Sequence, residues 1–259
     1  MKILLTGKNG YVAKSLYSYL ANKHAITSIG RLDFDLANSQ DVKSFMKDKH
    51  FDVVIHTAIK GGSRLKVDDV STFYENMLCF YNLYDCKSSY ERFITFGSGA
   101  EVAARDTQYG LSKRCISDII RGDDRFTNLR IFAVFDENEL DQRFIKSNII
   151  RYIKKEPMVI HQDKFMDFFY MQDLCKLVEH YIDSDGDALS KLVECSYNKK
   201  YRLLDIAKII NNLSDYKVSV VVENEGLAQE YIGKESPDMD FIGLEKGIQI
   251  TYNKLKKLF

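Results

Sequence analysis

Short apolar runs alternate with amphipathic segments through the first half of the chain, and this alternation restricts the possible folds more than any other feature. Five runs have the length of buried strands: residues 2–6, 25–29, 52–55, 93–96 and 129–132. Four segments between them have helical spacing of apolar residues: residues 10–22, 39–48, 69–85 and 107–121. Strands that alternate with helices of this length predict βαβ units, a parallel sheet and helices on both of its faces.

The pattern becomes less regular after Val134. It predicts further helices at residues 142–154, 172–182, 203–213 and 249–258, and short strands at residues 159–160, 168–170 and 217–222. We therefore predict an α/β fold with a Rossmann-type, doubly wound parallel sheet and a small C-terminal α/β lobe. Residues 1–134, completed by parts of 165–200, would bind the cofactor, and residues 135–259 would mainly bind substrate. Ligands of open parallel sheets bind at the carboxyl ends of the strands, so functional residues are sought there.

Composition narrows the classes of function. The 259 residues include 37 Lys and Arg against 37 Asp and Glu, so the net charge of zero disfavours a dedicated nucleic-acid binder. No apolar run approaches the roughly 18 residues that span a membrane, and the start MKILLTGKNG lacks the apolar stretch of a secretory signal. The five cysteines show no C-x-x-C spacing and predict neither a disulfide framework nor a metal site. We expect a cytoplasmic protein with reduced thiols and no bound metal.

The segment Gly7–Ala13, with sequence GKNGYVA, joins the first strand to the first helix. A glycine permits the tight turn, a second lets the backbone approach a pyrophosphate, and Ala13 is small enough for close packing of helix and strand. The helix N-terminus then offers free N–H groups to an anion. In this context the segment predicts a dinucleotide site.

The end of the second strand indicates which dinucleotide is preferred. An acidic residue there favours NAD, whereas an arginine accommodates the 2′-phosphate of NADP. The chain has Arg31 there and no acid, and Lys8 adds a second cation, so NADP(H) is preferred and NAD(H) remains possible. The alternative is that Arg31 is a solvated charge and Asp33 takes the acidic role. Asp35 and Leu36 would meet the adenine.

Three further residues predict the catalytic chemistry. Tyr109 and Lys113 are spaced i and i+4 and so share one face of a helix. A nearby ammonium favours phenolate and lowers the pKa of the phenol, which makes Tyr109 a candidate proton donor. Ser98 ends the fourth strand, where its hydroxyl would polarise a carbonyl while a nicotinamide delivers hydride.

These features resemble the extended branch of the short-chain dehydrogenase/reductase superfamily, which acts on nucleotide-activated sugars. The motifs that carry the resemblance are Thr6–Gly10, Asp52–Ala58, Ser98–Ala100, Tyr109–Lys113, Met166–Leu174 and Leu244–Ile248. Within the branch, Ala58–Gly62 and Phe73–Met77 are most similar to GDP-fucose synthases, which are NADPH-dependent epimerases and 4-ketoreductases. The resemblance implies a Rossmann domain, a small substrate lobe and the catalytic roles assigned above.

The chain departs from the family at positions that matter for the reaction. Ala100 stands where the epimerising members of the subgroup have Cys, and no His lies between Leu129 and His161 to act as its partner acid. Gly99 and Ala100 also replace the Asp-Glu pair of the 4,6-dehydratases. These replacements disfavour C3/C5 epimerisation and 4,6-dehydration, and they leave simple hydride transfer at a sugar carbonyl or carbinol. The interval of 11 residues from Ser98 to Tyr109 is short for the extended branch. Ala133 and Met166 replace a common Asn and Arg, which weakens the transfer of substrate contacts.

The resemblance and the motifs together give a set of expected contacts. The cofactor would meet Gly7, Lys8, Asn9, Gly10, Tyr11, Val12, Arg31, Asp35, Leu36, Thr57, Ala58, Lys60, Asn76, Tyr109 and Lys113. The substrate would meet Gly62, Ser98, Arg143 and Lys146, the last two at its diphosphate, unless they are solvated surface charges. Asn76 would support the backbone near Lys113. His56, at the end of a buried strand, is expected to be a core histidine.

The segment 69–85 carries apolar residues around the whole helix rather than along one stripe. Such a helix must be covered on both sides, so we expect a homodimer through residues 69–85 and 107–121. The function predicted is NADPH-dependent reduction of a nucleotide-linked 4-keto-sugar. One alternative is an NAD-dependent nucleotide-sugar 4-epimerase, and a second is a non-catalytic dinucleotide-binding regulator.

Overall fold

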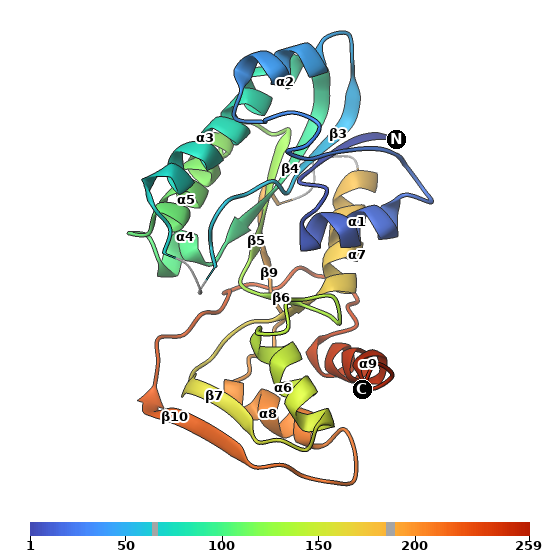
Figure 1. The fold of residues 1–259 in the computed structure, drawn as a ribbon. Coiled ribbons are helices and arrows are strands. Elements are labelled where there is room, and N and C mark those ends of the chain that lie inside the picture. Colours follow the sequence, from blue (N-terminus) through green and yellow to red (C-terminus); the bar gives the residue numbers. More distant parts are fainter. Residues whose placement is uncertain (64–66, 185–189) are drawn as a thin grey trace. The chain divides into compact units, whose positions relative to one another are not determined.

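The structure, a computed structural model, describes residues 1–63, 67–184 and 190–259. The chain divides into two compact units (Figure 1). The first comprises Met1–Arg130 and Cys175–Val193, and the second comprises Ile131–Leu174 and Glu194–Phe259. The first unit thus recruits a later segment of the chain, which supplies most of helix α7 (Met171–Asp183).

A parallel sheet organises the first unit. Its strands are β1 (Lys2–Thr6), β2 (Ala25–Ile29), β3 (Phe51–His56), β4 (Tyr90–Ser98), β5 (Phe126–Ile131) and β9 (Leu192–Cys195). In the described residues these strands have the order β2-β1-β3-β4-β5-β9. The pairs β1–β2, β1–β3 and β3–β4 are parallel. The predicted fold class is therefore confirmed. In β1, Ile3, Leu4 and Leu5 are fully buried because both faces of the sheet are covered.

Helices cover the two faces of this sheet. They are α1 (Tyr11–Leu20), α2 (Ser39–Met46), α3 (Val70–Asp85), α4 (Ala100–Ala103) and α5 (Gln108–Ile120), with α7 and the short 3₁₀ helix η1 (Lys87–Ser89). Figure 1 shows α2, α3 and α5 on one face and α1 and α7 on the other. Under α3 and α5, Phe93 packs its ring against Phe80 and Phe126, with centroids 6.0 and 5.1 Å away. This aromatic cluster fixes β4, the strand that ends at Ser98.

The second unit is built from short elements. Strands β6 (Val134–Phe135) and β8 (Phe169–Tyr170) pair in parallel, as do β7 (Met158–Asp163) and β10 (Val220–Leu227). Its helices are α6 (Phe144–Ile153), α8 (Leu203–Asn211) and α9 (Leu244–Leu255). Residues from all of these helices share one apolar core.

Two elements of the second unit differ from the sequence prediction. The strand predicted at residues 217–222 begins only at Val220. The Asn211 side chain accepts the Val218 N–H at 3.0 Å and donates to the Val218 carbonyl at 2.9 Å, so both backbone groups of Val218 are occupied. The helix predicted at 249–258 begins earlier, directly after Gly243 at φ 84°. Gly247 sits inside this helix because a Cβ there would come within 2.8 Å of the Tyr170 ring.

The described residues bear on two expectations, that the chain has no membrane span and no metal site. None of the helices in the described ranges is long and apolar enough to cross a membrane. The same ranges contain no group of three or more His, Cys, Asp or Glu side chains that could hold a metal ion. All five cysteines lie in these ranges and are free thiols.

Candidate active site

The turn after β1 forms a cradle for an anion. Gly7 has φ 76°, and a Cβ there would lie 2.8 Å from Thr57 Oγ1 and 2.9 Å from the Ala58 nitrogen. The Gly10 N–H donates to the Gly7 carbonyl at 2.8 Å, and Gly10 caps α1 without any side-chain hydrogen bond. The start of α1 points its positive dipole end at this turn, and the glycines leave room for an anion there. These residues fit a dinucleotide pyrophosphate.

A cavity of about 460 Å³ opens beside this cradle, at the carboxyl ends of β1, β2 and β3. The predicted cofactor residues that line it are Gly7, Asn9, Gly10, Tyr11, Val12, Arg31, Asp35, Leu36, Thr57, Ala58, Lys60 and Asn76. Lys8, Tyr109 and Lys113 do not line it. The lining residues that sequence reasoning missed are Gly30, Phe34, Ile59, Glu75 and Cys79. Glu75 and Cys79 are one helical turn apart and flank Asn76, a spacing that could have indicated them.

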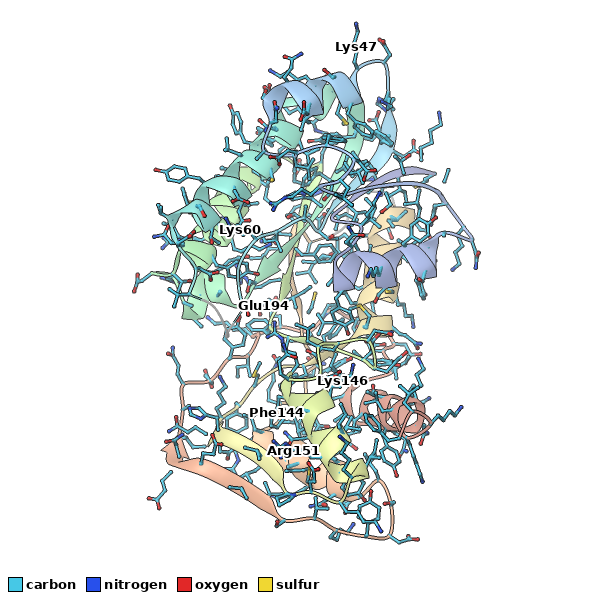
Figure 2. The ribbon with its side chains drawn as sticks, viewed as in Figure 1. Lys47, Lys60, Phe144, Lys146, Arg151 and Glu194 are labelled. Atoms are coloured by element: carbon cyan, nitrogen blue, oxygen red, sulfur yellow. The ribbon has the colours of Figure 1, made fainter. Side chains whose placement is uncertain are left out.

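The cations expected to bind a 2′-phosphate are paired with carboxylates. Lys8 forms an ion pair with Asp33 at 2.7 Å, and the Gly30 N–H donates to the same carboxylate at 2.8 Å. The hydrogen bond from Lys8, followed by that from Gly30, lowers the pKa of Asp33. Arg31 binds Glu75 at 3.0 Å, and Lys60, beside α3 in Figure 2, binds the other oxygen of Glu75. Each of the three cations is thus bound to a carboxylate, and Glu75 binds two of them.

Helix α5 places Lys113 in the interior. The side chain of Thr107, the residue before α5, accepts the Gly110 N–H at 3.0 Å and so fixes the start of the helix. Lys113 is 7% exposed, and its Nζ donates to the Phe96 carbonyl at 2.5 Å. Burial lowers the pKa of Lys113 to about 8, against an opposing influence of Glu101. The Nζ lies 5.8 Å from the centre of the Tyr109 ring, so a buried ammonium faces the phenol.

Ser98 is held at the end of β4 by Glu101. The Ser98 N–H donates to Glu101 Oε1 at 2.8 Å, and the Ser98 hydroxyl accepts the Ala100 N–H at 3.2 Å. Glu101 is 3% exposed, and its Oε2 binds Arg130 of β5 at 2.8 and 3.1 Å. Both carboxylate oxygens are therefore occupied, and Glu101 stabilises the turn that carries the serine.

The loop after β3 contacts Tyr109. Gly62 has φ 71°, and a Cβ there would come within 2.8 Å of Tyr109 Cζ. Asn76 accepts the Lys60 N–H at 2.8 Å and donates to the Ser112 hydroxyl at 3.1 Å. The Ser112 hydroxyl in turn donates to the Tyr109 carbonyl at 2.8 Å. Asn76 thus joins the loop after β3 to α5 through Ser112. Ser112 is the residue before Lys113, near which Asn76 is expected to support the backbone.

His56 is a core residue. Its ring is 4% exposed, and Nδ1 lies 2.9 Å from Thr6 Oγ1. Burial lowers its pKa to about 3, and the nearby Lys113 acts in the same direction, so the ring stays neutral. Its Nε2 has no hydrogen-bond partner within the described ranges.

The second unit holds the two basic residues predicted to meet a diphosphate. Arg143 is the residue before α6, and Lys146 follows within its first turn (Figure 2). Lys146 is 9% exposed, donates to the Glu139 carbonyl at 2.6 Å and pairs with Asp141 at 2.8 Å. The alternative that Lys146 is a solvated surface charge is therefore wrong, because its ammonium is buried and bound within its own unit. Burial also raises the pKa of Glu139 to about 8.

Comparison with known proteins identifies the family. Residues 3–190 match the NAD dependent epimerase/dehydratase family. The chain belongs to this family. Its membership confirms the resemblance to the extended short-chain dehydrogenase/reductases and the prediction of an NAD(P)-dependent enzyme from a family of nucleotide-sugar oxidoreductases and epimerases.

Several individual members are similar to this chain. A GDP-6-deoxy-D-talose 4-dehydrogenase from Aggregatibacter actinomycetemcomitans is 22% identical over 222 residues, 75% of this chain and 72% of that protein. The structure of a Campylobacter jejuni GDP-mannoheptose C4 reductase with NADP bound covers 98% of both chains, with a TM-score of 0.80 and 16% identity. A Bacillus cereus UDP-glucuronic acid 4-epimerase with NAD covers 100% of this chain and 97% of its own, with a TM-score of 0.76 and 17% identity. At these identities the structural likeness shows the fold.

Proposed function

We propose that the chain is an NADPH-dependent reductase that converts the 4-keto group of a nucleotide-activated deoxysugar to an alcohol. The observation that carries the proposal is the buried Lys113 ammonium, which lies 5.8 Å from the centre of the Tyr109 ring. Ser98 stands at the end of β4, the strand that pairs with β3. The positions that carry extra acid–base residues in epimerising and dehydrating relatives hold Gly99 and Ala100 here. The GDP-sugar 4-reductase and 4-dehydrogenase among the similar proteins also support this reaction.

The chain's own residues would perform the proton chemistry. A bound nicotinamide supplies hydride to the carbonyl carbon. Ser98 would donate a hydrogen bond to the carbonyl oxygen, and its position is fixed by Glu101 and by the Ala100 N–H. Tyr109 would transfer its phenolic proton to the same oxygen, and Lys113 would stabilise the phenolate that remains. Gly62, which packs on the Tyr109 ring, would keep the phenol in place.

NADP(H) is the preferred cofactor in this proposal, and NAD(H) is a possible one. The support for NADP(H) is Arg31, which follows β2 and lines the cavity, and Lys60, which reaches the same rim. Arg31 is 77% exposed in its side chain, so it can turn toward a bound 2′-phosphate. Arginine suits this role because its planar guanidinium binds phosphate through two parallel hydrogen bonds.

The direct test uses purified protein with NADPH and a panel of GDP-, UDP- and dTDP-linked 4-keto-6-deoxyhexoses. A reductase consumes one NADPH for each sugar reduced, seen as loss of nicotinamide absorbance. The 4-epimerase alternative predicts interconversion of the matching 4-hydroxy sugars with no net consumption of cofactor. Epimerisation without cofactor loss would contradict the proposal.

The rate of reduction should depend on the charge of Lys113. Because burial lowers its pKa to about 8, the ammonium that stabilises the phenolate is present below that pH and lost above it. We expect kcat to fall up to about tenfold per pH unit above pH about 8. In Lys113→Arg, whose guanidinium stays charged, this limb should move to higher pH. An unchanged limb in that variant would assign the titration to another group.

The apolar outer face of α3 supports a homodimer. Val70, Tyr74, Leu78 and Tyr81 are 59%, 60%, 46% and 55% exposed and follow helical spacing along one face. A second copy of the chain would cover this face together with residues of α5. We expect light scattering at micromolar concentration to give the dimer mass, and Leu78→Lys to give the monomer. A monomeric wild-type protein would rule the dimer out.

A further inference from the structure

We infer that Glu75 limits the preference of the cavity for NADP(H), because its carboxylate holds the two cations that a 2′-phosphate needs. The inference rests on the proposed use of this cavity for the adenosine half of the cofactor. Glu75 on α3 would thus supply the acidic side chain that the end of β2 lacks.

Three elements meet at the Glu75 carboxylate. Arg31 follows β2, Lys60 follows β3, and Glu75 lies in the second turn of α3. Glu75 Oε2 accepts from an Arg31 terminal nitrogen at 3.0 Å, and Oε1 accepts from Lys60 Nζ. Lys60 Nζ also donates to the Ser71 hydroxyl at 2.7 Å. All three charged residues line the cavity, and the Glu75 side chain is 32% exposed.

The surroundings of Glu75 mark the adenosine end of the cavity. The turn after β1 forms the pyrophosphate cradle with Gly7 and Gly10. Asp35, which follows β2, and Cys79, one turn after Glu75 on α3, line the same cavity. Burial raises the pKa of the Cys79 thiol to about 11, with further contributions from Asp35 and Glu75 and an opposing one from Arg31. Arg31, Asp35, Glu75 and Cys79 all line this cavity, and Arg31 contacts Glu75 directly.

Charge decides which ribose this end favours. A 2′-phosphate carries close to two negative charges at neutral pH, so it would compete with Glu75 for Arg31 and Lys60 and be repelled by the carboxylate. A 2′-hydroxyl carries no charge and can donate a hydrogen bond to a carboxylate. Lys8 does not restore the balance, because Asp33 binds it at 2.7 Å. Selectivity is the difference between the two affinities, and Glu75 reduces that difference.

The test is Glu75→Gln, which keeps the size of the side chain and removes its charge. Calorimetric titration would measure the affinities for NADP⁺ and NAD⁺ and for the fragments 2′,5′-ADP and 5′-AMP. We expect the two 2′-phosphorylated ligands to bind about tenfold tighter and the other two to bind equally or up to about threefold more weakly. Glu91→Gln is the matched control, since Glu91 is an exposed carboxylate, paired with His50, at the opposite end of β4. It should leave all four affinities unchanged.

A second variant tests whether Glu75 acts by holding Arg31. In an Arg31→Met background, Glu75→Gln should gain much less than tenfold for NADP⁺, because only Lys60 remains to be released. Equal changes for NADP⁺ and NAD⁺, or weaker binding of NADP⁺ by Glu75→Gln, would overturn the inference. No sugar substrate enters these measurements. Failure of the reductase assay would therefore count against the proposed reaction and leave the assignment of Glu75 intact.

Discussion

Tyr109→Phe should abolish most turnover while leaving the fold and the cofactor site intact. The phenol is the proposed proton donor, and loss of a positioned acid typically lowers kcat by roughly 10²–10⁴-fold. The phenylalanine ring keeps the surface on which Gly62 packs, so stability should change little. Tyr109 does not line the dinucleotide cavity, and the dissociation constant for NADP⁺ should stay within about threefold of the wild-type value. Steady-state kinetics and calorimetric titration measure the two quantities separately.

Tyr17→Phe provides the control for this substitution. Tyr17 is 46% exposed on α1, and loss of its hydroxyl should alter neither turnover nor binding. If Tyr109→Phe retains wild-type turnover, another group is the proton donor. If the wild-type protein binds NADP⁺ and turns over no nucleotide sugar, the regulator alternative gains support.

Gly7→Ala should damage both stability and cofactor binding. An alanine at φ 76° costs about 1–2 kcal/mol, and its Cβ would overlap Thr57 Oγ1 and the Ala58 backbone at 2.8–2.9 Å. Overlap with backbone costs roughly another 1–3 kcal/mol, because the neighbouring loop has to move. We expect the free energy of unfolding to fall by about 2–5 kcal/mol in urea titrations. The moved loop forms one wall of the cavity, so NADP⁺ binding should be lost as well.

Gly122→Ala is the matched control, since no heavy atom lies within 4 Å of a Cβ at that position. Its free energy of unfolding should stay within about 0.5 kcal/mol of the wild-type value. Similar stabilities for the two variants would show that the turn after β1 adapts to a side chain, and the cradle would then not depend on Gly7.

Local chemistry made much of the fold and of the cofactor cavity predictable. The apolar run at Lys2–Thr6 has the length of a strand buried on both faces, and the glycines after it favour a tight turn at its end. These features are encoded by neighbouring residues. The spacing of Tyr109 and Lys113 likewise fixes their common face, and the structure places Lys113 Nζ 5.8 Å from the Tyr109 ring.

The features that the sequence did not reveal depend on contacts between distant residues. Glu75 became part of the cavity because α3 brings it to Arg31, 44 positions away. Glu101 follows Ser98 closely, but its role is set by Arg130 on β5, 29 positions away. The start of β10 is an exception in distance, because Asn211 is only seven positions from Val218, but the side-chain contact with the Val218 backbone is equally absent from the apolar pattern. Pairings of this kind follow from the packing of elements, which no local pattern of the sequence specifies.

Transfer of deuterium from labelled NADPH tests the proposed reaction most directly. The protein would be incubated with NADPH carrying deuterium at the transferable nicotinamide position and with a nucleotide-linked 4-keto-sugar, and the product analysed by mass spectrometry and NMR. The proposed mechanism predicts one deuterium on carbon 4 of each product sugar and one NADP⁺ formed for each. Product that forms without deuterium, or without oxidation of NADPH, would contradict it.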